Sequence, residues 1–297
     1  MRRRTFLFGS ALLGLTSPTT AIGGGIPGGV RVSVTPPNPQ PGDVLLLQLS
    51  GVPPDVRAEW DGRPLVLFPA ASGWAALVGI DLEVRPGPVG WRVTRPSAAK
   101  NGGALAAGAV TVRARTFPTQ QLTLPKGMVD LDAATLARVE SERGELKAAL
   151  AEVTPERLWR GPFRVPLEGG QPTGGFGLRR LINGQPRSPH TGYDWAAPSG
   201  TPVLAANAGR AALVTEHFFA GRHVVVDHGL GLFTLYYHLT ETRVAAGDPV
   251  AAGQVIGTVG ATGRVTGPHL HFAVLLGGAR VDPEALLRLV PPEEPAP

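Results

Sequence analysis

The sequence is 297 residues long, enough for about two domains with hydrophobic cores of their own. Its formal net charge is +5, but residues 1–21 hold three arginines and no acidic residue, so the rest of the chain carries 25 basic against 23 acidic residues. That near balance, without a basic run, argues against a nucleic-acid-binding surface, and the absence of cysteine excludes disulfide bonds and lipoprotein anchoring.

The first 21 residues have the pattern of a secretory signal peptide. Arginines at positions 2, 3 and 4 precede an apolar stretch over residues 6–15, which is too short to span a bilayer, and Thr19-Thr-Ala21 resembles a small-residue cleavage site. The run Arg3-Arg-Thr-Phe-Leu7 also resembles a twin-arginine signal, although an arginine stands where serine or threonine is usual. We predict export to the periplasm or cell envelope, with no stable membrane anchor after cleavage.

Residues 30–116 have the pattern of a β-sandwich. Short alternating or apolar runs are separated by turns rich in proline and glycine at a spacing of about ten residues. The predicted strands cover residues 30–34, 44–49, 64–68, 74–80, 91–94 and 109–114. The opening Pro36-Pro-Asn-Pro-Gln-Pro-Gly42 and the Asp61-Gly62 turn resemble those of immunoglobulin-like domains. No catalytic grouping occurs in this region.

Residues 117–165 are predicted to be a linker that contains one long helix over residues 131–151. Asp132 can cap its start, Thr154-Pro155 lies beyond its end, and four apolar residues form a stripe at helical spacing: Leu136, Val139, Leu146 and Leu150. We expect the stripe to pack against the protein. At the other end of the chain, the acidic, proline-rich residues 291–297 are predicted to be a disordered tail.

All seven histidines of the chain fall between residues 190 and 271. Four of the candidate ligands stand in two short motifs, His190-Thr-Gly-Tyr-Asp194 and His269-Leu-His271. In an extended strand, residues two or four positions apart point to the same face, about 6–7 Å apart for neighbours on that face. Neutral imidazole and carboxylate are ligands that Zn²⁺ prefers, and a catalytic zinc site uses three of them. The two motifs therefore predict a metal site.

The motifs lie in a longer pattern. It runs through His190-Thr-Gly-Tyr-Asp-Trp-Ala-Ala-Pro-Ser-Gly-Thr-Pro-Val203, Tyr236-Tyr-His-Leu239, Gly247-Asp-Pro-Val-Ala-Ala-Gly-Gln-Val-Ile-Gly257 and Gly263-Arg-Val-Thr-Gly-Pro-His-Leu-His-Phe272. This order resembles the M23 metallopeptidases, the lysostaphin-like family of peptidoglycan endopeptidases, over residues 171–289. The resemblance implies a mainly β protein with an antiparallel, barrel-sandwich-like catalytic domain at 166–290. It also implies Zn²⁺ held by His190, Asp194 and His271.

Two further histidines, His238 and His269, match active-site histidines of that family. His269 shares a strand face with His271, which places its imidazole beside the metal as a general base. His238 is then expected to stabilise the oxyanion or donate a proton. If residues 232–239 form a regular strand, His238 shares a face with Thr234 and Tyr236.

The remaining histidines and one arginine have weaker indications. Nothing pairs with His217 or His223 at metal-ligand spacing, so both are expected at the surface. His228 follows Asp227 and precedes a glycine, which favours structural hydrogen bonding at a turn. Arg179 could bind a substrate carboxylate through both oxygens or be a solvated structural residue.

The sequence therefore predicts an exported zinc metalloendopeptidase that hydrolyses cross-link or bridge peptides of peptidoglycan by zinc-activated water with a histidine base. The alternative is a catalytically silent relative that binds wall peptide or activates another hydrolase. A third possibility is a wall-binding module with secondary peptidase activity. The N-terminal region would be a wall-contacting spacer, a structural unit or a latency element. No motif predicts an oligomeric state.

Overall fold

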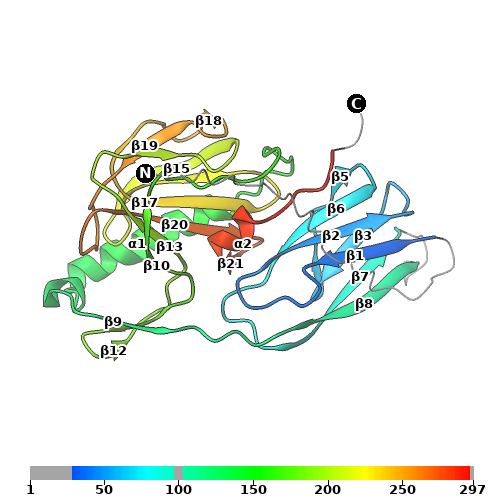
Figure 1. The fold of residues 1–297 in the computed structure, drawn as a ribbon, viewed down its shortest axis with the longest axis horizontal. Coiled ribbons are helices and arrows are strands. Elements are labelled where there is room, and N and C mark those ends of the chain that lie inside the picture. Colours follow the sequence, from blue (N-terminus) through cyan, green and yellow to red (C-terminus); the bar gives the residue numbers. More distant parts are fainter. Residues whose placement is uncertain (1–28, 97–102, 295–297) are drawn as a thin grey trace, which may run out of the picture.

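The computed structural model describes residues 29–96 and 103–294. The predicted signal peptide lies outside the described residues. The protein is mainly β, as predicted, with two sheets from the N-terminal region at one end and a large antiparallel sheet at the other (Figure 1). Within the described residues, no helix has both the length and the apolar character that a membrane crossing requires.

The N-terminal region forms two four-stranded antiparallel sheets. The first has the order β1-β2-β6-β5 and the second β4-β3-β7-β8. Their strands are β1 (Arg31–Thr35), β2 (Val44–Ser50), β3 (Arg57–Trp60), β4 (Arg63–Pro64), β5 (Phe68–Ala70), β6 (Gly73–Gly79), β7 (Gly87–Thr94) and β8 (Ala104–Val112). The single strand predicted over residues 64–68 is wrong, because β4 ends at Pro64 and β5 begins at Phe68.

Strand β2 is buried on both faces, which explains its nearly continuous apolar sequence. Leu45, Leu47 and Leu49 pack into the core between the two N-terminal sheets. Val44 and Leu46 point the other way and join the core of the C-terminal region. Since successive strand residues face opposite sides, the first sheet belongs to two cores at once. The two regions are therefore joined by apolar packing.

Ion pairs reinforce this junction. Arg280 donates two hydrogen bonds to the carboxylate of Asp81, at 2.6 and 3.0 Å, and a third to Glu83 at 2.8 Å. In the segment 291–294, which belongs to the tail predicted to be disordered, the Glu294 carboxylate binds Arg157 and Arg160 at 2.7 and 2.9 Å. Charges brought close by the fold hold this segment, and the sequence pattern alone does not reveal them.

The C-terminal region is built on a ten-stranded sheet with the order β10-β13-β20-β17-β16-β15-β18, to which β14, β19 and β21 are attached. Its strands are β10 (Gln171–Gly174), β13 (Gly192–Ala196), β14 (Pro202–Leu204), β15 (Gly209–His217), β16 (Gly221–Asp227), β17 (Leu232–Thr242), β18 (Pro249–Val250), β19 (Val255–Val259), β20 (His269–Leu276) and β21 (Ala279–Val281). The short helix α2 (Pro283–Leu287) follows.

The middle of the chain supplies a small separate sheet and the long helix. The sheet has the order β12-β11-β9, from β9 (Thr119–Leu122), β11 (Arg179–Ile182) and β12 (Gln185–Pro186), and a 3-10 turn spans Lys126–Met128. Helix α1 (Ala133–Ala151) begins after Asp132, whose side chain accepts a hydrogen bond from the Thr135 amide at 2.7 Å. The predicted capping residue is thus confirmed.

Helix α1 covers one face of the large sheet. Leu146 and Leu150 pack against the cluster of Val225, Phe233, Leu235 and Ala273. Val139 is buried, but Leu136 is 55% exposed, so the predicted apolar stripe is shorter than expected. The helix contacts β15 of this sheet (Figure 1).

Candidate active site

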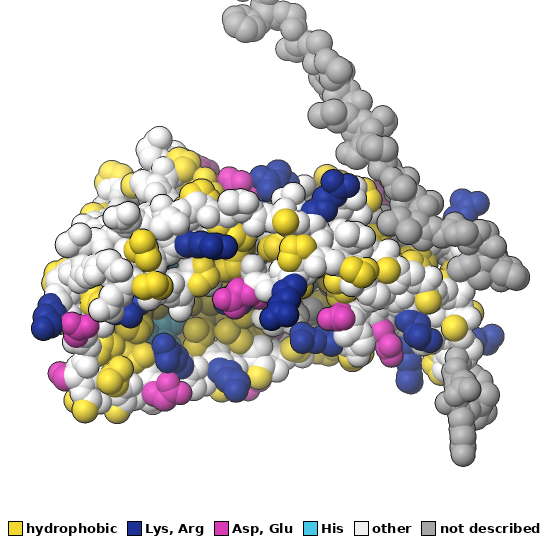
Figure 2. Space-filling view, turned by 90° about the horizontal axis from the view of Figure 1, so that it is seen from below, with side chains coloured by type: hydrophobic (Ala, Val, Ile, Leu, Met, Phe, Trp, Pro, Cys, Tyr) yellow, Lys and Arg dark blue, Asp and Glu magenta, His cyan; other side chains and the backbone are white. Residues whose placement is uncertain are grey.

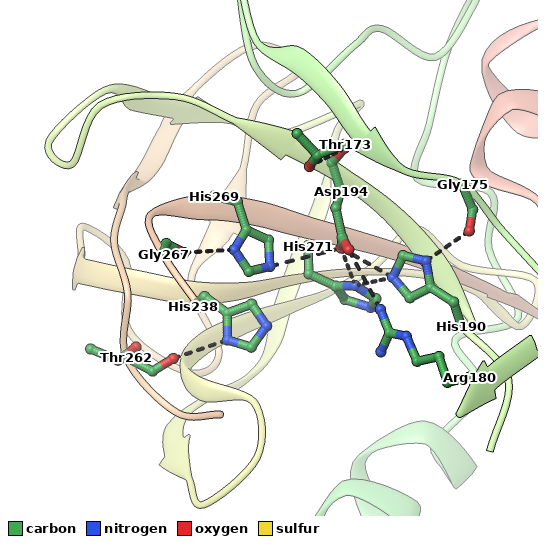
Figure 3. A network of polar contacts seen from close by, with 10 residues as sticks. All are labelled: Thr173, Gly175, Arg180, His190, Asp194, His238, Thr262, Gly267, His269 and His271. Carbon is green, nitrogen blue, oxygen red and sulfur yellow. Dashed lines mark hydrogen bonds and ion pairs between the residues drawn. The ribbon is translucent and has the colours of Figure 1, made fainter. Parts of the chain in front are cut away.

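Three side chains converge on one point of the large sheet (Figure 3). His190 Nε2 lies 3.0 Å from Asp194 Oδ1 and 2.9 Å from His271 Nδ1, and the last two atoms are 2.8 Å apart. His190 is almost fully buried, while Asp194 and His271 are slightly more open. The structure therefore brings together the three residues for which the sequence predicts metal ligation.

Strand pairing produces this convergence. Asp194 on β13 and His271 on β20 are direct register partners in an antiparallel pair. His190 precedes β13 and turns back toward both. Gly192 makes the close pairing possible: a Cβ there would lie 2.5 Å from the Phe272 carbonyl oxygen and 2.7 Å from His271 Nε2. The glycine of the first motif is thus a packing requirement of the site.

Backbone carbonyls fix the orientation of three histidine rings. Nδ1 of His190 donates to the Gly175 oxygen at 2.7 Å, that of His238 to Thr262 at 2.9 Å and that of His269 to Gly267 at 2.9 Å. A carbonyl only accepts, so in each neutral ring Nε2 keeps its lone pair. For His190 this lone pair faces the Asp194–His271 pair, as a metal ligand requires.

His238 and His269 stand together beside the three convergent residues. Their ring centroids are 4.7 Å apart, and His269 Nε2 is 3.9 Å from Asp194 Oδ1. The expectation that His269 and His271 share a strand face agrees with their register on β20. Tyr237 completes the group, with its ring stacked on His271 at a centroid distance of 5.3 Å.

The path by which His238 reaches the site differs from the sequence prediction. Thr234 and Tyr236 face the buried core, and regular alternation would send His238 there as well. Instead, the register of β16 and β17 shifts between the pairs Val224↔Tyr236 and Arg222↔Leu239. Two residues of β17 therefore lie opposite one residue of β16, His223. His238 has φ of 66° at this bulge. The bulge turns its side chain to the site face, so the predicted strand parity is wrong.

Burial and neighbouring charge set the protonation of the group. Burial alone would raise the pKa of Asp194, but the imidazoles of His190 and His271 beside its carboxylate outweigh burial and hold that pKa far below its usual range. Burial, followed by the positive charges that His271 and His269 can carry, lowers the pKa of His238 to about 3. The cluster is therefore a carboxylate surrounded by imidazoles of which His238 is neutral at neutral pH.

The cluster lies in a hollow of the surface. Figure 2 shows histidine at its bottom, with arginine or lysine side chains beside the opening. A groove of about 310 Å³ is lined by Asp194, His238, His269 and His271, by β9 and β11, and by residues 264–268. A second depression of about 260 Å³ extends from His190 and His238 to helix α1. An extended chain lying across both would pass over the cluster.

Arg180 lines both depressions, and the sequence did not point to it. One guanidinium nitrogen lies 3.5 Å from Asp194 Oδ2. Arg179, for which a carboxylate clamp and a solvated structural role were both open, is exposed and does not line the groove, which agrees with the solvated role. The segment Arg179-Arg-Leu-Ile182 shows no alternation, so only the pairing of β11 reveals which arginine turns inward.

The other histidines have structural surroundings. His217 and His223 are buried, so the surface position predicted for them is wrong; α1 covers them, and His217 Nε2 lies 2.9 Å from Glu145. His228 hydrogen bonds to the Ala208 oxygen and the Thr234 hydroxyl, each at 2.7 Å, next to a turn. The structural role predicted for His228 is confirmed.

The donor set fits zinc. Two imidazole nitrogens and one carboxylate oxygen are typical of catalytic zinc sites, in which a fourth position stays open. Three ligands in a tetrahedron around zinc would lie about 3.3 Å from one another. The observed separations of 2.8–3.0 Å require only a few tenths of an ångström of outward movement. The groove provides the open side.

Comparison with known proteins identifies the family of the chain that carries this site. The model of peptidase family M23 matches residues 188–283, which contain all three convergent residues. A crystal structure of an M23 peptidase from Pseudomonas aeruginosa superposes with a TM-score of 0.65 at 32% identity, covering 84% of this chain and 95% of that one. The chain belongs to peptidase family M23.

Curated M23 relatives match over a shorter part. Peptidoglycan DD-endopeptidase ShyC of Vibrio cholerae is 40% identical over 126 residues, 42% of this chain and 29% of that protein. DD-carboxypeptidase/endopeptidase Mpg of Neisseria meningitidis is 39% identical over 127 residues, 38% of this chain and 29% of that protein. The aligned part thus spans less than a third of each relative.

Proposed function

We propose that this M23 protein is an exported zinc metalloendopeptidase that hydrolyses peptide bonds in peptidoglycan. The observation that carries the proposal is the convergence of His190, Asp194 and His271 at the bottom of a groove, with two more histidines presenting Nε2 beside them. The names of two relatives, a peptidoglycan DD-endopeptidase of Vibrio cholerae and a DD-carboxypeptidase/endopeptidase of Neisseria meningitidis, support the substrate class. Export rests on the arginine-rich, apolar start of the sequence.

We assign His190, Asp194 and His271 as the ligands that would hold zinc. Zinc bound there would supply Lewis acidity and lower the pKa of a water molecule to about 7. The Gly175 carbonyl keeps Nε2 of His190 unprotonated, and Asp194 stays ionised because its pKa is held low. His190 and Asp194 therefore present their donor atoms without first losing a proton, whereas Nδ1 of His271, which faces these two acceptors, would release its hydrogen on binding zinc.

His269 is the proposed general base. Its Nδ1–H is engaged by the Gly267 carbonyl, so Nε2 takes the proton of the attacking water, and the same carbonyl stabilises the imidazolium. The protonated ring can then give this proton to the leaving nitrogen. The chain thus returns to its starting state after one peptide bond is hydrolysed.

The role of His238 depends on its tautomer. Because its Nδ1–H donates to Thr262, Nε2 of the neutral ring carries no hydrogen and cannot donate to a substrate oxygen. His238 can stabilise an oxyanion only after it gains a proton. We therefore propose that the proton of the attacking water goes to His269, and that neutral His238, whose ring centroid lies 4.7 Å from that of His269, accepts a hydrogen bond from this water through Nε2.

The decisive experiment is mass spectrometry of muropeptides released from isolated cell wall by the purified protein, with zinc content measured in parallel. We expect new peptide ends with the unaltered protein and none with His190→Ala or His269→Ala. Only His190→Ala should lose zinc, so His269→Ala serves as a metal-replete control. An unchanged muropeptide profile from zinc-loaded unaltered protein would favour a regulator of another hydrolase instead.

A further inference from the structure

Two strands that are far apart in the sequence form one wall of the groove. Strand β9 pairs in parallel with β11, and Gln120↔Arg180 and Leu122↔Ile182 are register partners. Alternate residues of a strand share a face, so these four side chains lie on one surface, and all of them line the groove. The wall is polar at the Gln120–Arg180 end and apolar at the Leu122–Ile182 end.

The polar end of this wall holds two unpaired atoms. Gln120 Oε1 and Arg180 Nε are both buried, and neither has a hydrogen-bond partner among the residues that the structure describes. One is an acceptor and the other a donor. An unpaired buried polar atom destabilises a fold, and native proteins keep few of them. Both atoms belong to side chains that line the groove, so a ligand toward which these side chains turn would satisfy both.

The chemistry of the pair selects among ligands. A peptide backbone offers an N–H and a C=O on the same chain, which match the Gln120 oxygen and the Arg180 nitrogen. A carboxylate would bind Arg180 but would place negative charge against the Gln120 oxygen. The apolar surface of Leu122 and Ile182 beside the pair suits a small apolar side chain, such as the methyl group of alanine.

We propose that Gln120 and Arg180 form a substrate subsite that hydrogen bonds to the backbone of an extended peptide, with its small side chain against Leu122 and Ile182. This inference rests on the proposed function for the nature of the peptide. It assigns β9, which precedes residues 188–283, to the binding groove. If β9 only closed the site, its polar side chains would occupy the groove. A groove of about 310 Å³ instead remains beside β9.

The test is equilibrium binding of soluble, cross-linked muropeptide dimers to the metal-free, full-length protein by titration calorimetry, together with the thermal unfolding midpoint. Gln120→Leu removes the unpaired oxygen at nearly constant volume. We expect Kd to rise about tenfold, the loss of one hydrogen bond, while the unfolding midpoint stays the same or increases. Gln121→Leu, on the exposed face of the same strand, is the matched control and should change neither quantity.

Three results would overturn the subsite. The first is an unchanged Kd in Gln120→Leu. The second is a lower Kd in this variant, which would indicate that β9 blocks the groove. The third is a lowered unfolding midpoint, which would indicate a structural role for Gln120. Failure of dimer binding to the unaltered protein would also refute it. Failure of the proposed function has a separate sign: dimers bind, but zinc-loaded unaltered protein does not cleave them.

Discussion

Acid should destabilise this protein through His228. Burial lowers the pKa of this histidine to about 4, against the small opposing effect of its hydrogen bond to the Ala208 carbonyl. In an unfolded chain the pKa is about 6.5. The folded state thus binds fewer protons than the unfolded state between these values. Stability is complete above pH 6.5 and falls as the pH decreases toward 4.

The two pKa values give the size of the effect. A difference of about 2.5 units corresponds to about 3.4 kcal/mol of unfolding free energy lost below pH 4, and to about 2 kcal/mol at pH 5. The contacts of His228 explain why the ring stays neutral. Its Nδ1–H donates to the Ala208 carbonyl, and the Thr234 hydroxyl at Nε2 is a neutral group that supplies no negative charge to balance an imidazolium.

The assay is urea unfolding of the unaltered protein and of His228→Asn at pH 8 and pH 5. The variant is less stable at pH 8 because it loses a buried ring, but it has no group to protonate. We expect its deficit relative to the unaltered protein to shrink by about 2 kcal/mol at pH 5. A deficit that is the same at both pH values would refute the argument from burial. The comparison also cancels the acid sensitivity of His223, whose pKa is similarly lowered by burial.

Three further substitutions test other contacts. Gly192→Ala should lower zinc affinity at least tenfold in a chelator competition, because its methyl group meets the backbone and ring at His271; unchanged affinity would contradict the close-packing argument. Asp81→Asn should lower the unfolding free energy by about 1–2 kcal/mol, because it weakens the ion pair with Arg280. This loss should be smaller in high salt, and a loss that does not depend on salt would indicate that packing is responsible instead. Asp132→Ala should lower the unfolding free energy measured with urea, because α1 loses its cap, whereas Asp132→Ser should recover most of the loss.

The sequence pattern predicted those features of the site that depend on residues close together in the chain. Two histidines separated by one residue share a face on any regular strand, and His269 and His271 do so on β20. The clustering of histidine motifs also identified the residues that converge. Their actual contact, however, depends on the pairing of Asp194 with His271, which lie 77 positions apart.

Sequence reasoning failed where distant segments or an irregular backbone decide the outcome. Regular alternation cannot anticipate the extra residue of β17 that reorients His238. His217 and His223 are buried because α1 lies over them, and no feature near either histidine signals that cover. Gln120 belongs to the wall only through parallel pairing with Arg180, 60 positions later.

The loop before β20 links these irregular features to catalysis. It supplies the carbonyls of Thr262 and Gly267, so one loop fixes the tautomers of both His238 and His269. Gly263, with φ of 78°, lets this loop approach the backbone of Gly221, where a Cβ would collide. The proton-transfer geometry therefore depends on contact between the 260–268 loop and the turn before β16. Loss of that contact would leave the metal ligands in place while releasing both histidines that we propose act on the attacking water.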